Sequence, residues 1–202
     1  MKKILIVGAG AMGAAFSIPL LDNGHSVALT EPYNFKLFKK LNSKKKIHPS
    51  LNINLPKKLK INKFSSEILN RKWDLIVIAV SSIGIDLIGK NLSKVKNKSP
   101  ILVLTKGLKL DGRNLISMSS LLKKYNKNLN ISVLKGPCLA KELARKVKSF
   151  TVVANKNINT AKKIGKLIST NYYQTEFSRD VRGVEFLSAI KNIYSMIIGA
   201  GQ

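Results

Sequence analysis

The chain has 202 residues, of which 45% are hydrophobic, so its length predicts one domain or slightly more with a real core. It contains no run of about 18 apolar residues that would indicate a membrane span, and its one cysteine, Cys138, excludes an internal disulfide and a metal site built from several cysteines; a reducing cytoplasm fits. The net charge of +26, from 36 basic and 10 acidic residues, favours nucleic acid, an anionic membrane surface or an acidic small ligand as partner.

The first twenty residues carry the strongest pattern. Residues 3–7 (KILIV) form a short apolar run typical of a strand that is buried on both faces. The glycines Gly8, Gly10 and Gly13 follow in a G-x-G-x-x-G spacing, and residues 14–21 predict a helix. Between a strand and a helix this spacing is the dinucleotide fingerprint: the first glycine allows the turn, the second lets a pyrophosphate approach, and the third lets the helix pack closely.

An acidic residue stands where such a site needs one. Residues 26–29 predict a second strand and Glu31 ends it, close to the spacing of a carboxylate that binds the cofactor ribose. Such a carboxylate would favour NADH over NADPH, because it repels a 2′-phosphate. A secretory signal is the alternative for this terminus, since Lys2 and Lys3 precede apolar residues, but three glycines interrupt the stretch and no convincing cleavage site follows.

Strands and helices alternate along the rest of the chain. Further strands are predicted at 59–61, 74–80, 100–104, 131–134, 150–154 and 172–175. Further helices are predicted at 32–41, from 65 onward, and at 85–92, 114–125, 139–147 and 160–168. The alternation predicts an α/β fold with a doubly wound, mostly parallel Rossmann sheet. Polar residues end several strands, at the sheet edge where ligands bind in such folds.

Two further segments stand apart. Residues 42–56 are polar, basic and rich in turn residues, which predicts a long loop, and His48 within it is expected to be solvated. Residues 184–199 predict one long helix with a broad apolar stripe that includes Phe186, Ile190, Ile193 and Ile197. We therefore expect the stripe to face the sheet, another chain or a further domain.

The basic residues are spread along the chain and most are lysine, which makes point contacts where arginine would read bases and phosphates with a fork. Lysine, asparagine and isoleucine are abundant together, which indicates compositional bias. We expect a field that attracts phosphorylated ligands, not specific nucleic-acid binding.

Four motifs in this order resemble NAD(P)-dependent glycerol-3-phosphate dehydrogenase. They are residues 8–13 (GAGAMG), Lys106-Gly107, residues 136–142 (GPCLAKE), and the segment from Gly183-Val184-Glu185 to Ala189-Ile190-Lys191-Asn192. Residues 19–24 and 191–195 are similar to the archaeal-type branch. The resemblance covers nearly the whole chain and implies interconversion of dihydroxyacetone phosphate and sn-glycerol 3-phosphate by hydride transfer with NAD, or with NADP, to supply glycerol phosphate for phospholipids.

The resemblance also implies roles for single residues. Lys191 matches the catalytic lysine, Lys106 a lysine that touches cofactor and substrate, and Asn192 a neighbour that orients the substrate. Substrate contacts are implied for Gly136 and Cys138. Cofactor contacts are implied for Gly8, Gly10, Ala11, Met12, Gly13, Glu31, Lys106 and Ala140.

The sequence departs from the family in ways that limit these implications. Thr30-Glu31-Pro32 stands where many bacterial members have a tryptophan and an arginine, and Cys138 stands where serine is common. The expected organisation is a dinucleotide-binding domain at 1–180 and the start of a helical substrate domain at 181–202, with the rest of that domain absent. The alternatives are a nucleotide-binding module without turnover and a different reductase, for example of branched keto acids. A homodimer is compatible with the sequence.

Overall fold

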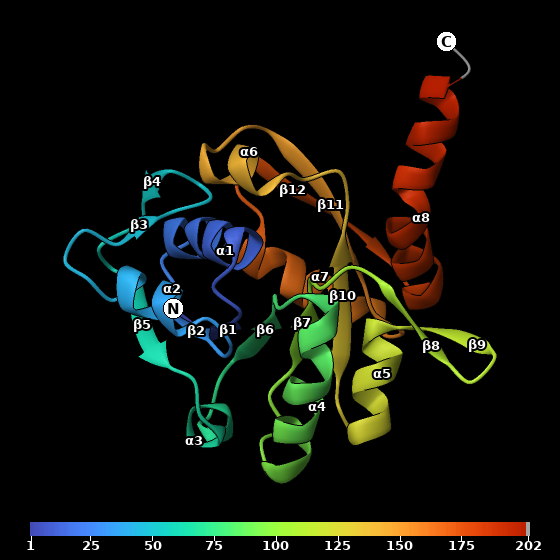
Figure 1. The fold of residues 1–202 in the computed structure, drawn as a ribbon, viewed down its shortest axis with the longest axis horizontal. Helices are drawn as coiled ribbons and strands as arrows, with labels where there is room; N and C mark the ends of the chain where they lie inside the picture. The colour runs from blue at the N-terminus through green and yellow to red at the C-terminus, as the bar shows by residue number, and fades with distance from the viewer. Residues whose placement is uncertain (201–202) are drawn as a thin grey trace.

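The computed structural model of the protein describes residues 1–200, except for the side chains of residues 192–198 and 200. Its centre is one eight-stranded sheet, with helices on both faces (Figure 1). In spatial order the strands are β5 (Lys60–Lys63), β2 (Ser26–Glu31), β1 (Lys3–Val7), β6 (Leu75–Ile78), β7 (Ile101–Val103), β10 (Ile131–Lys135), β11 (Ser149–Ala154) and β12 (Tyr173–Ser178).

The order of the first six strands is that of a dinucleotide-binding sheet. The strands from β5 to β10 run parallel, and the order reverses direction after β1, which pairs with β2 on one side and β6 on the other. In such sheets ligands bind at the carboxyl ends of the strands, where the order reverses. Strand β11 is antiparallel to β10, and β12 extends the sheet parallel to β11. The doubly wound, mostly parallel fold predicted from the sequence is confirmed.

Two hydrophobic cores, one on each face, hold the helices. One face is covered by α1 (Ala11–Asp22), α6 (Ala140–Ala144) and α7 (Ile158–Ile168). The other carries α3 (Ser66–Asn70), α4 (Ile85–Lys94), α5 (Met118–Tyr125) and the start of α8 (Val181–Ala200). Side chains alternate along β1, since Ile4 and Ile6 join the first core and Leu5 and Val7 the second. This explains why the strand reads as a continuous apolar run.

Helix α8 differs from the others in its surroundings. Its first turns pack on β10 and β11, while its far end stands clear of the rest of the ribbon (Figure 1). Phe186 and Ile190 are partly buried and Leu187 is 64% exposed. The side chains of Ile193 and Ile197, which the sequence also places on the apolar stripe, lie outside the described residues.

Several predicted boundaries are wrong. The helix predicted at 114–125 begins at Met118, because residues 114–117 form β9 (Asn114–Ser117), which pairs with β8 (Leu108–Asp111) in a hairpin. Helix α2 (Phe35–Leu41) begins three residues after Pro32, where the Asn34 side chain accepts a hydrogen bond from the Leu37 backbone N–H at 2.9 Å. The helix predicted at 139–147 ends at Ala144.

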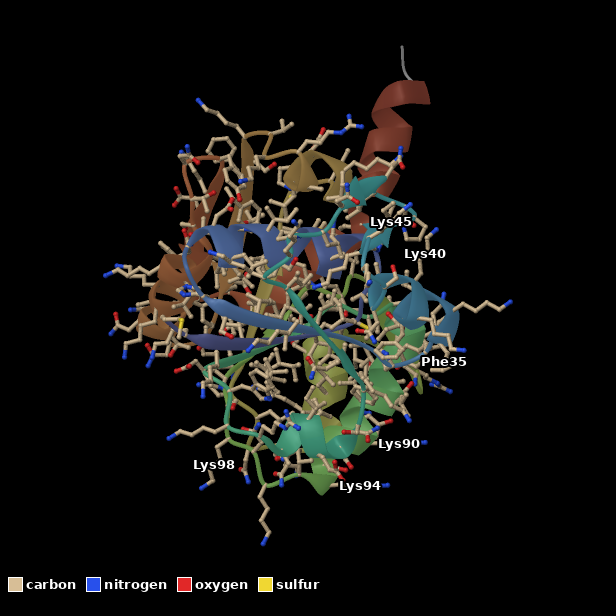
Figure 2. The ribbon with its side chains drawn as sticks, turned by 90° about the vertical axis from the view of Figure 1, so that its left-hand side faces the viewer. Phe35, Lys40, Lys45, Lys90, Lys94 and Lys98 are labelled. Atoms are coloured by element: carbon tan, nitrogen blue, oxygen red, sulfur yellow. The ribbon has the colours of Figure 1, made fainter. Side chains whose placement is uncertain are left out.

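The predicted loop at 42–56 contains a small antiparallel hairpin, formed by β3 (Ile47–His48) and β4 (Ile53–Asn54). Exposed lysines lie on several elements, and Figure 2 shows Lys40, Lys45, Lys90, Lys94 and Lys98 around α2, α4 and the loops that follow them. The positive charge is thus distributed over the surface. Within the described residues, no helix is long and apolar enough to cross a membrane.

Candidate functional site

The glycine loop has the geometry that its sequence predicts. Gly8 has φ +108°, and its N–H donates to the Thr30 carbonyl at 2.9 Å. A Cβ at Gly8 would lie 2.6 Å from the Ala79 carbonyl oxygen, and one at Gly13 would lie 1.9 Å from the Gly8 carbonyl oxygen. A Cβ at Gly10 would meet no atom within 4 Å. Gly8 and Gly13 are therefore required by the fold, while the backbone at Gly10 is open to a ligand.

Glu31 ties the end of β2 to this loop. One of its carboxylate oxygens accepts a hydrogen bond from the Ala9 N–H at 2.8 Å, and the other accepts from the N–H groups of Tyr33 and Asn34 at 3.0 and 3.1 Å. The side chain thus lies beside the glycine loop, as predicted. Its hydrogen bonds give it a structural role that the sequence did not indicate.

The prediction that His48 is solvated is wrong. The side chain is only 1% exposed, and its Nε2 lies 2.9 Å from the Ala9 carbonyl oxygen. The Leu51 N–H donates to Nδ1 at 3.3 Å, so Nδ1 is the acceptor and Nε2 carries the hydrogen. His48 and Glu31 therefore hold Ala9 from both sides, through its C=O and its N–H. The 42–56 segment folds back on the glycine loop and buries this ring.

A cavity of about 320 Å³ opens beside Gly10. It is lined by Gly10, Asn34, Lys36, Leu37, Lys40, His48, Pro49 and Ser50. Its place next to the second glycine, at the carboxyl end of β1, is where the adenosine half of a dinucleotide lies in this fold class. The two lysines make it electropositive, which suits a phosphate as well as a ribose.

Lys106 lies at the same edge of the sheet, in the loop after β7. The preceding residue, Thr105, is buried and donates from its hydroxyl to the Val80 carbonyl at 2.7 Å, which joins this loop to the end of β6. Partial desolvation and the nearby Lys191 lower the pKa of Lys106. Gly107 has φ +123°, so the turn after Lys106 requires glycine. The structure therefore brings Lys106 and Lys191 together.

The motif that begins at Gly136 follows β10 at this edge. A Cβ at Gly136 would lie 2.8 Å from the Phe150 carbonyl oxygen, so the chain passes too close to β11 for another residue. Cys138 is buried, and burial raises the pKa of its thiol. Gly136 and Cys138 line a small cavity together with Met12 and Lys106. Ala140 begins α6, which packs against α1.

Lys191 reaches this region from α8. Its exposed side chain lines a groove of about 250 Å³ between α8 and the ends of β10 and β11. The other lining residues are Lys135, Gly136, Pro137, Val152, Val184, Leu187 and Ser188. The side chain of Asn192, predicted to orient the substrate, lies outside the described residues. Lys106, Gly136 and Lys191 thus converge from three separate elements.

Lys135 is a residue of this edge that no sequence pattern indicated. It is 4% exposed, and its ammonium donates to the backbone carbonyls of Val103 at 3.4 Å and Thr105 at 2.5 Å. Desolvation, which Glu185 opposes and Lys106 reinforces, lowers its pKa to about 8. Lysine ends a strand in many sequences, so only the fold shows that this one is buried.

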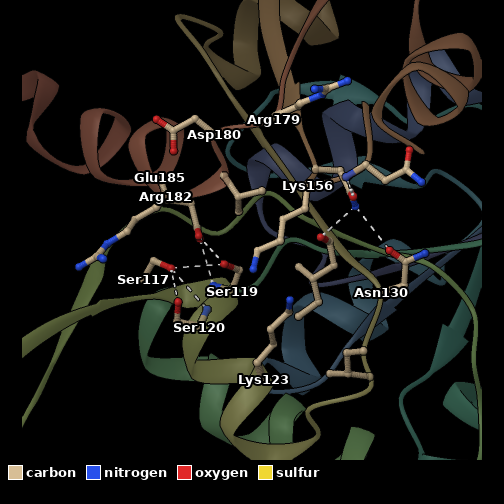
Figure 3. Close-up of a pocket in the computed structure, with 15 residues that line it drawn as sticks. Ser117, Ser119, Ser120, Lys123, Asn130, Lys156, Arg179, Asp180, Arg182 and Glu185 are labelled. Atoms are coloured by element: carbon tan, nitrogen blue, oxygen red, sulfur yellow. Dashed lines mark hydrogen bonds between the residues drawn. The ribbon is translucent and has the colours of Figure 1, made fainter. Parts of the chain in front are cut away.

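Another cavity lies at the opposite edge of the sheet. Its volume is about 490 Å³, and Figure 3 shows the side chains of Lys123 and Lys156 reaching into it. The buried Glu185 accepts hydrogen bonds there from the N–H and the hydroxyl of Ser119. These bonds join the start of α8 to the start of α5. The cavity is separate from the edge of the sheet that carries the glycine loop and Lys106.

The family model for the N-terminal part of NAD-dependent glycerol-3-phosphate dehydrogenase matches residues 3–161. A glycerol-3-phosphate dehydrogenase [NAD(P)+] of Leptospira biflexa is 32% identical over 98% of this chain and 60% of its own length. An NADP(+)-dependent glycerol-3-phosphate dehydrogenase of Archaeoglobus fulgidus is 27% identical over 96% of this chain and 59% of its own. Bacterial and archaeal relatives match alike, so the archaeal-type branch stays a prediction.

Solved structures agree in fold. A glycerol-3-phosphate dehydrogenase from Plasmodium falciparum superposes with a TM-score of 0.85 at 18% identity, over 95% of this chain and 56% of that one. The enzyme from Coxiella burnetii gives 0.81 at 24% identity, over 95% and 58%. The chain thus spans about three fifths of the curated relatives that it matches. The names of these relatives give NAD or NADP as the cofactor, which agrees with the cofactor predicted from the sequence. This chain belongs to the family of NAD-dependent glycerol-3-phosphate dehydrogenases.

Proposed function

We propose that the chain is the cofactor-binding part of an enzyme that interconverts dihydroxyacetone phosphate and sn-glycerol 3-phosphate, and so supplies glycerol phosphate for phospholipids. The observation that carries the proposal is the convergence of Lys106, Gly136 and Lys191 beside the glycine loop. We assign residues 1–180 to the cofactor domain and 181–202 to the start of the substrate domain. The free, buried Cys138 fits a cytoplasmic location, and a homodimer stays possible.

The residues of the glycine loop fit a dinucleotide. Gly10 leaves the backbone open, and the N-terminus of α1 directs free N–H groups toward this space, which favours a pyrophosphate. Ala11 and Met12 form the first turn of that helix, and Ala140 lies on α6 against it. When bound, the nicotinamide cofactor supplies or accepts the hydride. Every other step falls to side chains of the protein.

Lys191 is proposed to hold the proton that the reaction needs. Addition of a hydride to the carbonyl carbon places negative charge on the carbonyl oxygen, and a lysine ammonium stabilises that charge and gives up a proton to it. In the reverse direction, the neutral amine takes the proton back from the alcohol. Lys106 lies close enough to Lys191 for the two charges to interact, and Lys191 lowers the pKa of Lys106. Asn192, the next residue, would orient the substrate.

Gly136 and Cys138 are proposed to contact the substrate, because they lie beside Lys106 around a cavity of about 20 Å³ and Gly136 also lines the groove that contains Lys191. Lys106 would then touch both cofactor and substrate. The resulting site is open on the side of the α8 groove, where Leu187 is exposed. Small misplacements of a substrate cost orders of magnitude in rate. We therefore propose that this chain binds the cofactor and turns over dihydroxyacetone phosphate very poorly.

The test compares cofactor binding with turnover. NADH binding is followed by its fluorescence, and NADH oxidation is measured with dihydroxyacetone phosphate for this chain, for Lys191→Ala and for a version extended by any downstream helical sequence. We expect binding by all three and robust turnover only by the extended version. Absence of NADH binding by the unmutated chain would refute the proposed function. Robust turnover by the short chain that is lost in Lys191→Ala would show that the short site is complete.

A nucleotide-binding module without turnover is the second candidate. It is favoured by the open groove beside Lys191. The extended version distinguishes the two candidates, because a pure binding module stays inactive in it.

A further inference from the structure

The register between β7 and β10 places Lys135 beside the loop that carries Lys106. The parallel ladder pairs Ile131 with Ile101 and Val133 with Val103, and it ends there. Continued by two residues, the same register would set Lys135 opposite Thr105. Beyond the last backbone pair, the Lys135 ammonium links β10 to β7, because it donates to the carbonyls of Val103 and Thr105. The side chain thus prolongs the contact between the two strands past the end of the ladder.

A buried ammonium needs such partners. Lys135 is 4% exposed, and an unpaired charge at that burial would be strongly unfavourable. One carbonyl that accepts from it belongs to Val103, the last residue of β7, and the other to Thr105, directly before Lys106. Hydrogen bonds from a charged donor are stronger than neutral ones. The ammonium therefore fixes the backbone from which Lys106 projects.

The charges around Lys135 come from two neighbouring elements. Lys106 in the loop after β7 disfavours its charged form, and Glu185 on α8 favours it. Lys191, also on α8, lines the same groove. Lys135 thus interacts with Lys106 electrostatically, and it also contacts the same loop through its hydrogen bond to the Thr105 carbonyl.

We infer that Lys135 is a positioning residue of the site, which acts through Lys106 by holding the Thr105–Gly107 loop at the carboxyl end of the sheet. The inference rests on the proposed function, because it assigns Lys106 to the cofactor site. It gives a role to a residue outside the four motifs.

The chain offers a matched control. Lys46 also donates from its ammonium to two backbone carbonyls, those of Lys57 at 3.1 Å and Leu59 at 2.7 Å. It is partly buried and is not among the residues that line the cavity beside Gly10. Lys46→Met thus removes two hydrogen bonds of the same kind without touching the Lys106 loop. Lys135→Met is the test variant, because methionine is similar in length and has no donor.

The first measurement is NADH affinity at neutral pH, with thermal stability recorded beside it. We expect Lys135→Met to weaken NADH binding about tenfold, which corresponds to the loss of one good interaction, while Lys46→Met binds NADH like the unmutated chain. Equal NADH affinity in all three proteins would overturn the inference and leave Lys135 with a purely structural role.

The second measurement needs neither cofactor nor a variant at Lys135. Lysine side-chain NMR of the chain alone is used to follow the titration of Lys135, with Lys106→Met and Lys46→Met compared. We expect Lys106→Met to raise the Lys135 pKa toward its ordinary value, and Lys46→Met to leave it unchanged. An unchanged Lys135 titration in Lys106→Met would overturn the coupling. If the unmutated chain fails to bind NADH, the proposed function fails, and this measurement still decides the coupling. The same measurement tests the coupling even where Lys135→Met fails to fold, because it does not use that variant.

Discussion

Two glycines of the same loop are predicted to respond in opposite ways to an added side chain. Gly10 has φ −61° and ψ 177°, an extended conformation open to any residue, and a Cβ there meets nothing within 4 Å. Gly10→Val should therefore fold normally, with a stability change within about 1 kcal/mol for a residue at a helix N-cap. A pyrophosphate at the helix N-terminus would meet the valine methyl groups. We expect NADH affinity to fall at least about a hundredfold, or roughly 2.7 kcal/mol.

Gly13→Ala should do the reverse. Its Cβ would lie 1.9 Å from the Gly8 carbonyl oxygen, whereas a close carbon–oxygen contact is about 3.3 Å. Helix α1 would have to move by roughly 1.4 Å against a packed core, and overpacking of this kind costs about 1–3 kcal/mol or more. For a chain of this size each kcal/mol lowers the melting temperature by about 2–4 °C. The loss should therefore appear first in stability.

The assay pairs NADH titration with thermal unfolding for both variants. Gly10→Val should keep its melting temperature and lose affinity for NADH, whereas Gly13→Ala should unfold at a lower temperature. If Gly10→Val binds NADH normally, the glycine loop is structural only. If Gly10→Val unfolds, the open space at this position is not available to a side chain, and the geometric argument is wrong.

Three further results are expected. The Glu31 carboxylate should make NADH bind more tightly than NADPH, and Glu31→Ala should reduce this difference in affinity. Equal or tighter binding of NADPH by the unmutated chain would contradict this prediction. It would indicate that Lys36 and Lys40 in the neighbouring cavity attract the 2′-phosphate. If Lys36 and Lys40 attract that phosphate, the double variant Lys36→Gln and Lys40→Gln should weaken NADPH binding more than NADH binding in parallel titrations. Because the folded pKa of Lys135 is about 8 against 10.5 ordinarily, the unfolded chain binds more protons above about pH 8, so stability should rise with pH there. Between about pH 8 and pH 9.5 denaturant titrations should show a gain of about 2 kcal/mol that Lys135→Met lacks, and an equal gain in both proteins would refute the assignment.

The fold could be predicted where local signals agreed with one another. The apolar run at residues 3–7, the glycine spacing and the alternation that follows fixed the sheet class, because buried parallel strands read as continuous apolar runs. The error at 114–117 has a physical reason. Gly112 and Arg113 form the two-residue loop of a hairpin, and Gly112 has φ +59°, but residues 114–125 also have helical periodicity. The turn outweighed the periodicity in the first four residues.

The candidate site residues could be proposed from the sequence only through motifs that follow strands. Lys106 and Gly136 come directly after β7 and β10, and parallel strands bring their carboxyl ends to one edge. His48 and Lys135 were misjudged or missed, since their roles depend on burial against backbone carbonyls far away in sequence. A sequence pattern indicates which residues are polar, but only the packed chain shows which of them water cannot reach.

The three lysines at this edge also indicate what kind of ligand the site favours. Lys106 and Lys135 both have lowered pKa values, with desolvation as the first cause and a neighbouring lysine as a further one. Lys191 adds a third cation from α8. Repulsion between the lysines is an unfavourable contribution to the folded chain, which the attraction of Glu185 for Lys135 opposes. A ligand with negative charge also offsets such repulsion on binding. If the proposed function holds, we expect a ligand that carries a phosphate to bind more tightly here than an uncharged ketone of the same shape.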